Sequence, residues 1–244
     1  GDLHLHAALL SHGAVEFLHQ KVHGRACLLA VNVPEGQGDR LLFIQQRFFP
    51  AAGESKNIGS IYGAPADCVW GGGRAGFGEH DPKEVLALTR EYGISARLTL
   101  SNSLLRPEHL TDPDCNALCR LFQEQNDPQN GAIVHAELLT QYLKKNYPSL
   151  YLVSSTTKVL TDFNDLQREL ARPEFRYVVP DFRLNRAFDR LAALPQSRKD
   201  KVEFLCNECC WFGCTERRAC YEAVSRKNLG LPGPEHYCSA PGAA

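Results

Sequence analysis

The chain has 244 residues, 43% of them hydrophobic, and is long enough to bury one substantial core. Its 27 basic and 28 acidic residues give a net charge of −1, so the overall charge gives no electrostatic signal for binding nucleic acid or an anionic membrane. No apolar run approaches the roughly 20 residues that cross a bilayer, and the N-terminus lacks the pattern of a signal peptide, so we expect a cytoplasmic protein with no membrane partner.

Residues 1–57 show no consistent pattern, and we treat them as an N-terminal segment of undetermined structure. The runs ACLLAVNV (26–33) and RLLFIQQRFF (40–49) have strand composition, but the stretch between them suits a hairpin as well as a crossover. The opening run GDLHLHAALL has no clear partner. Its His4-x-His6 pair has the spacing of a metal pair that ends the first strand of amidohydrolase-type barrels, but too few residues precede it to form that strand.

From residue 58 onward, short β-rich runs alternate with helical patterns. Six strands are predicted, at residues 58–63, 96–101, 131–136, 150–155, 175–180 and 201–206. Helices are predicted at residues 81–93, 112–125, 137–148, 161–173, 184–195 and 216–228. This alternation predicts parallel strands with crossover helices, and therefore an α/β domain over 58–244 with the fold of a (β/α) TIM-like barrel.

The ends of the chain indicate that this barrel is incomplete. The chain contains no methionine, not even at its first position, and it ends in the small, polar stretch SAPGAA. We therefore expect a fragment or a processed product, with a barrel that is truncated at the C-terminus.

Polar residues follow five of the six predicted strands. In parallel α/β folds the loops at the carboxyl ends of the strands gather the functional groups, although polar strand ends are also common without a function. The candidates for a polar pocket at this edge are Asn102, His135, Ser154, Lys158, Asp181 and Asn207. Lys158 is either a catalytic amine or a solvated charge, and the sequence does not separate the two.

Other features of the sequence have structural interpretations. The run GGGRAGFG contains the GxGxxG spacing from Gly71 to Gly76, but the next helix begins too late for a dinucleotide site, so a tight loop is favoured. Two cysteines at 115 and 119 lie on one helical face, where buried small hydrophobic side chains are more common than ligands. The isolated cysteines at 27 and 68 receive the same interpretation.

A cysteine cluster lies at residues 206–238, directly after the last predicted strand, and comprises Cys206, Cys209, Cys210, Cys214, Cys220 and Cys238. Disulfides are disfavoured in a reducing compartment, and two adjacent cysteines bridge each other only with strain. Use as buried hydrophobic side chains would account for one or two members. Ligation of a metal by four of them fits best, because thiolates are soft ligands for zinc and for iron–sulfur clusters.

The spacing of the cluster bears on the choice of metal. Structural zinc sites usually combine two CxxC knuckles, and only Cys206-x-x-Cys209 qualifies here. Irregular spacing with a distant fourth ligand, as in Cys210, Cys214, Cys220 and Cys238, is familiar for [4Fe–4S] clusters. The neighbouring Arg217 and Arg218 would offset the negative charge of a thiolate-ligated cluster. Iron–sulfur is therefore favoured over zinc.

The stretches IYGAPADCVWGGGR, SNSLL, SSTTK, VVPDFRLN and CNECCWFGC together resemble the peptidase U32 family, and most closely its uncharacterised bacterial relatives. The resemblance covers roughly residues 58–240. It implies a barrel with a [4Fe–4S] cluster on four cysteines, and a function similar to that of oxygen-independent hydroxylation factors, which act on RNA bases or on a quinone precursor. Cys210 is the position that matches the family's first cysteine, with Cys214 and Cys238 next. The spacing after Cys210 is shorter than in the family, and Cys206, Cys209 and Cys220 are additional.

Two functional hypotheses follow. The first is an iron–sulfur protein with Cys210, Cys214, Cys220 and Cys238 as ligands and Cys206 and Cys209 as alternates, which acts on a small molecule or an RNA. No Ser-His-Asp elbow or HExxH motif supports proteolysis. The rival is a zinc-stabilised, non-catalytic binding module in which the metal ties the last strand to the following loop.

Overall fold

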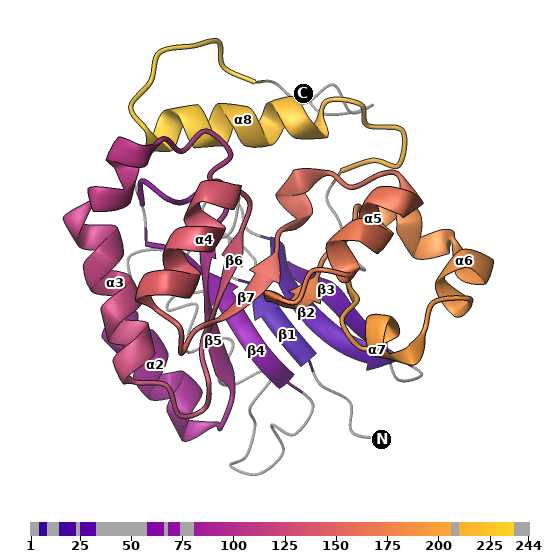
Figure 1. The fold of residues 1–244 in the computed structure, drawn as a ribbon, viewed down its shortest axis with the longest axis horizontal. Coiled ribbons are helices and arrows are strands. Elements are labelled where there is room, and N and C mark those ends of the chain that lie inside the picture. The colour runs from indigo at the N-terminus through magenta and orange to yellow at the C-terminus, as the bar shows by residue number, and fades with distance from the viewer. Residues whose placement is uncertain are drawn as a thin grey trace.

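The computed structural model describes residues 5–8, 15–22, 25–32, 58–65, 68–73, 81–205 and 210–236, and only the backbone of the first three ranges. This part of the chain has an α/β fold in which helices alternate with the strands of one sheet (Figure 1). Within it, no helix has the length and hydropathy of a membrane span.

Strands in the described ranges join in the order β8-β7-β6-β5-β4-β1-β2-β3-β9. Their bounds are β1 (Leu5–Ala8), β2 (Val15–Val22), β3 (Arg25–Asn32), β4 (Ile58–Gly63), β5 (Ser95–Leu100), β6 (Gly131–Val134), β7 (Tyr151–Ser154), β8 (Phe175–Val178) and β9 (Glu203–Leu205). The five strands β4 to β8 are parallel to one another. The strands predicted from residue 58 onward are confirmed to within a few residues at each end.

Three strands of the sheet come from the first 57 residues. The predicted strand at 26–33 is confirmed as β3, whereas the one at 40–49 lies outside the described residues. Residues 5–8, for which the sequence shows no clear partner, form β1, which runs parallel to β4 and antiparallel to β2. Strand β3 is antiparallel to β2 and parallel to β9.

The two ends of this strand order touch. Val202, just before β9, forms an isolated parallel bridge with Val178 at the end of β8. The backbone N–H of Val178 donates to the carbonyl of Lys201 at 2.8 Å. The short stretch around β9 therefore hydrogen-bonds both to β8 and to β3.

Most predicted helices are confirmed, and their first residues follow the expected chemistry. The helices described are α2 (Pro82–Glu91), α3 (Pro113–Glu124), α4 (Glu137–Asn146), α5 (Phe163–Leu170), α6 (Phe188–Ala192), α7 (Gln196–Lys199) and α8 (Arg217–Asn228). Asp81, Asp112 and Asp162 accept backbone N–H groups at the starts of α2, α3 and α5, which satisfies donors that a helix start leaves open.

The predicted helix at 184–195 is wrong in its form. A 3-10 turn at Phe182–Arg186 comes first, and the short helix α6 follows it. The Asp181 side chain accepts the backbone N–H of Arg183, which starts the turn before the predicted helix. The turn ends at Ala187, whose backbone has left the helical region, so the two pieces do not join into one helix.

The strands β5, β6 and β7 are buried on both faces. Ala96, Leu98 and Leu100 of β5 belong to the large apolar cluster that includes residues of the helices. The alternate positions face the other way, because successive strand side chains point to opposite sides. On that second face a smaller cluster gathers Ile133, Tyr151, Val153, Val179 and Leu205. Every residue of β5 is buried, as expected for a parallel strand covered on both sides.

Candidate functional site

The carboxyl ends of the parallel strands lie under helix α8. Figure 1 shows α8 across the end of the molecule toward which β6 and β7 point. Asn102, just after β5, is fully buried and donates through Nδ2 to the carbonyls of Val69 at 2.9 Å and Ser225 of α8 at 3.2 Å. Its Oδ1 accepts from the backbone of Leu104. Asn102 therefore fixes α8 over the strand ends.

The described start of the glycine run, residues 71–73, lies against the end of β5, while the rest of the predicted loop is not tested. A side chain at Gly72 would place its Cβ 2.4 Å from the Ser101 carbonyl oxygen and 2.6 Å from the Asn102 backbone. The loop consequently packs directly against the end of β5 only because this position lacks a side chain. Residues 74–80 lie outside the described part of the chain.

Ser154 and Lys158 share one carboxylate at the end of β7. The Ser154 hydroxyl donates to Glu169 Oε1 at 2.6 Å, and Lys158 Nζ contacts the same oxygen at 2.5 Å. Burial lowers the pKa of Lys158, although Glu169 opposes this. Burial alone would raise the pKa of Glu169, but the bonds from Lys158 and Ser154 lower it below its usual value. The group ties β7 to α5, which carries Glu169.

His135 lies beside the same group and is kept neutral. Its Nδ1 lies 2.8 Å from the Thr157 hydroxyl. Burial, together with the positive charges of Lys158 and Arg218, lowers the pKa of His135 to about 4. A neutral imidazole can accept one hydrogen bond and donate another, or it can ligate a metal. His135 can therefore bind a ligand in one of these ways near pH 7.

Asp181 is the centre of a second group, which the sequence reveals only in part. Its carboxylate is fully buried and accepts from Arg183 Nε at 2.6 Å, while Arg217 Nε lies 3.3 Å away. Arg217, in the first turn of α8, is 1% exposed, and its Nη2 donates to Thr156. Arg183 also donates to the backbone carbonyl of Cys214 at 2.9 Å. Sequence reasoning missed Arg183, although it lies two residues after Asp181.

Of the described cysteines of the cluster, Cys214 contacts this arginine pair through its backbone carbonyl. Cys214 is buried, whereas Cys210 and Cys220 are partly buried and Cys220 belongs to the first turn of α8. Across the described residues, no three His, Cys, Asp or Glu side chains are placed so that they could hold a metal ion. The three described members of the predicted ligand set, Cys210, Cys214 and Cys220, are therefore not gathered around one point. Cys206, Cys209, Cys238 and Asn207 lie outside the described residues, so the complete ligand set stays a prediction.

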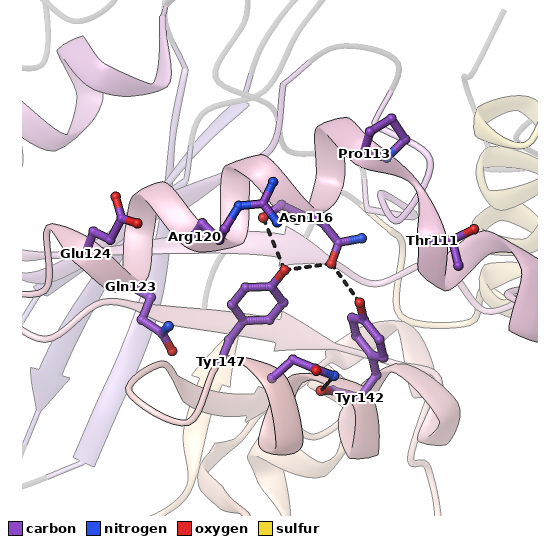
Figure 2. Close-up of a pocket in the computed structure, with 9 residues that line it drawn as sticks. Thr111, Pro113, Asn116, Arg120, Gln123, Glu124, Tyr142 and Tyr147 are labelled. Carbon is purple, nitrogen blue, oxygen red and sulfur yellow. Dashed lines mark hydrogen bonds between the residues drawn. The ribbon is translucent and has the colours of Figure 1, made fainter.

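A polar pocket of about 610 Å³ lies between α3 and α4, away from all of these groups. Figure 2 shows how its walls meet at Asn116, whose Oδ1 accepts from Tyr142 at 2.8 Å and from Tyr147 at 2.6 Å. None of the predicted pocket residues lines it. The two tyrosine hydroxyls fasten α4 and its end to α3.

The comparisons with known proteins bear on the fold. No family model matches the chain, and neither does a curated protein. Among solved structures, the chain is similar to the U32 peptidase Mk0906, with a TM-score of 0.51 and 14% sequence identity over 73% of this chain and 72% of that chain. At this identity the likeness concerns the fold alone. The chain thus has an α/β fold, with parallel strands and helices, of the kind found in a U32 peptidase.

Proposed function

We propose that the chain is a cytoplasmic U32-like barrel protein that binds a [4Fe–4S] cluster through Cys210, Cys214, Cys220 and Cys238. The observation that carries the proposal is the charge beside Cys214. Arg183 and Arg217 both contact the carboxylate of Asp181, so two positively charged guanidinium groups gather in a largely buried group. Arg183 contacts the Cys214 backbone directly, so this charge lies where a negative thiolate-ligated cluster would need it.

The donor chemistry fits a soft metal centre. Thiolates ligate iron–sulfur clusters, and arginine donors nearby tune such clusters through charge and hydrogen bonding. A bound cluster would supply one-electron redox chemistry, as needed by an oxygen-independent hydroxylation factor or another redox factor. The chain itself contributes the neutral His135 and the Lys158 ammonium at the same edge, where a small molecule or RNA substrate would bind.

We also propose that the sheet closes into a barrel. The bridge between Val178 and Val202 joins the ends of the strand order. Arg97 of β5 and Glu203 of β9 contact each other at 2.8 Å although several strands separate them in that order. Side chains of such distant strands meet when a sheet curves round a common interior.

The test is purification without oxygen, followed by metal analysis and absorption spectroscopy. We expect the purified protein to be brown, to absorb broadly near 400 nm and to contain about four irons per chain. Cys210→Ser and Cys214→Ser should lose most of the iron, whereas Cys119→Ser, a buried cysteine of α3, should keep it. Circular dichroism of each variant separates loss of iron from loss of fold.

The zinc-stabilised binding module predicts a different result. Colourless protein that holds one zinc per chain after anaerobic purification would replace the iron–sulfur proposal with this rival. Folded protein that contains neither metal would contradict both.

A further inference from the structure

A pair of cysteines outside the cluster lies in sulfur contact. Cys68 follows β4 and Cys115 lies in the first turn of α3, and their Sγ atoms are 3.6 Å apart. Cys119, one helical turn further along, has no such partner among the described residues. A disulfide requires the two sulfurs to approach to about 2.05 Å, so the pair lies about 1.5 Å outside bonding distance. The sequence predicts that these cysteines are hydrophobic side chains, and that interpretation does not account for a contact between two sulfurs.

The two cysteines have unequal chemistry. The Cys115 thiol, together with the backbone N–H groups of Trp70 and Gly71, hydrogen-bonds to the Cys68 sulfur and lowers the pKa of Cys68 against the effect of burial. The same hydrogen bond to Cys68, together with burial, raises the pKa of Cys115. Burial likewise raises the pKa of Cys119. Cys68 is also the more exposed of the two side chains and, because the thiolate is the nucleophile, it is the member of the pair that attacks.

The pair borders a cavity. Cys68 is 9% exposed and Cys115 3% exposed, and both line a cavity of about 540 Å³. Lys83, Asp112 and Asp114 supply charges of both signs among its lining residues. A volume of this size lies within the range of small-molecule sites.

We propose that Cys68 and Cys115 form a redox-active dithiol that is oxidised by small disulfides of the glutathione class. The Cys68 thiolate attacks one sulfur of the small disulfide, whose S–S bond breaks and releases a thiolate. Cys115 then loses its proton and attacks the Cys68 sulfur, which releases the second thiolate. Two protein thiols are thus oxidised to one disulfide, one small disulfide is reduced to two thiols, and the two protons end on those thiols.

The dithiol lies next to the candidate functional site but does not depend on it. The carbonyl of Trp70 accepts from the backbone of Asn102, and Asn228 at the end of α8 donates to Gly71 at 2.9 Å. Formation of the disulfide would hold the turn that carries Cys68 against α3, beneath the helix that covers the strand ends. Reversible disulfides of this kind are the form expected in a reducing compartment.

The test uses the full chain in a series of glutathione buffers of increasing oxidised fraction, with acid quenching, alkylation and peptide mass spectrometry. Trypsin releases Cys68 within residues 57–74, whereas Cys115 and Cys119 share another peptide, so a cross-link is identified directly and fragmentation assigns its partner. The expected product is a Cys68–Cys115 link that disappears again with excess reduced glutathione. Cys115→Ser should instead accumulate a glutathione mixed disulfide on Cys68.

Cys119→Ser is the matched control and should form the link at the same glutathione ratio as the wild type. Absence of a Cys68–Cys115 link in folded wild-type protein at every ratio would overturn the proposal, as would a link to Cys119 instead. If Cys115→Ser fails to fold, the wild-type result alone decides. Neither result depends on whether the chain binds iron.

Discussion

Replacement of Glu203 by glutamine should strongly destabilise the protein. Arg97 is 0% exposed and Glu203 1%, and Arg97 Nη1 donates to both carboxylate oxygens at 2.8 Å. Arg97 Nε also donates to the Tyr151 hydroxyl at 2.7 Å, and the guanidinium lies over the rings of Tyr151 and Tyr177. Burial alone would lower the pKa of Arg97, but Glu203 and Tyr151 raise it above its usual value, so the guanidinium stays charged.

Glu203→Gln keeps the shape of the side chain and removes its charge, which leaves a buried cation without its counter-ion. Removal of one partner of a buried pair costs about 3–5 kcal/mol of unfolding free energy. With an m-value of about 3 kcal/mol/M, the urea midpoint should fall by about 1–1.7 M. The fluorescence of the fully buried Trp70 reports the transition.

An exposed pair provides the matched control. Asp165→Asn makes the same chemical change next to Arg168, but both side chains are largely solvated, so the loss should stay below about 1 kcal/mol. The double variant Arg97→Met/Glu203→Leu removes both charges and should recover most of the stability that Glu203→Gln loses. If the unfolding free energy of Glu203→Gln lies within about 1 kcal/mol of the wild-type value, the buried ion pair between β5 and β9 would be refuted.

Three further predictions concern the remaining polar groups. Burial and two neighbouring cations lower the pKa of His135 to about 4, so as the pH falls the unfolded chain binds a proton before the folded chain does. The free energy of unfolding should therefore fall as the pH drops from about 6.5 towards 4. His135→Gln should remove up to about 3 kcal/mol of that loss, measured by urea titrations at each pH. Asp181→Asn should cost about 3 kcal/mol because Arg183 and Arg217 lose the buried carboxylate that they share, and unchanged thermal stability would contradict this. Tyr147→Phe removes the 2.6 Å bond to Asn116 and should cost about 1 kcal/mol without changing metal content.

Local signals account for the part of the fold that could be predicted from the sequence. Short β-rich runs predict the parallel strands, and Asp-Pro pairs predict the starts of helices. At one such start, the Asp112 side chain accepts the Cys115 N–H at 2.8 Å. In the first 57 residues the local antiparallel pairing of β2 with β1 and β3 was missed, and β1 and β3 also pair with strands further along the chain, β4 and β9. No local pattern encodes such a distant pairing.

The candidate site was predictable in its location and only partly in its contacts. Functional groups gather at the carboxyl ends of parallel strands, and this rule selects His135, Ser154 and Asp181. In the structure Ser154 ends β7, and His135 and Asp181 follow β6 and β8. It does not reveal that Ser154 bonds to Glu169 of α5, since that contact depends on how a helix packs against the sheet. The same holds for Arg97. An arginine in a buried strand indicates that a charged partner is present, but the sequence does not show that this partner is Glu203.

The most direct test of the proposed function is the iron and acid-labile sulfide content of wild-type protein purified without oxygen. Equal amounts, about four of each per chain, would agree with a [4Fe–4S] cluster held by the cysteines after β9. Folded protein without iron or sulfide, prepared under the same conditions, would contradict it.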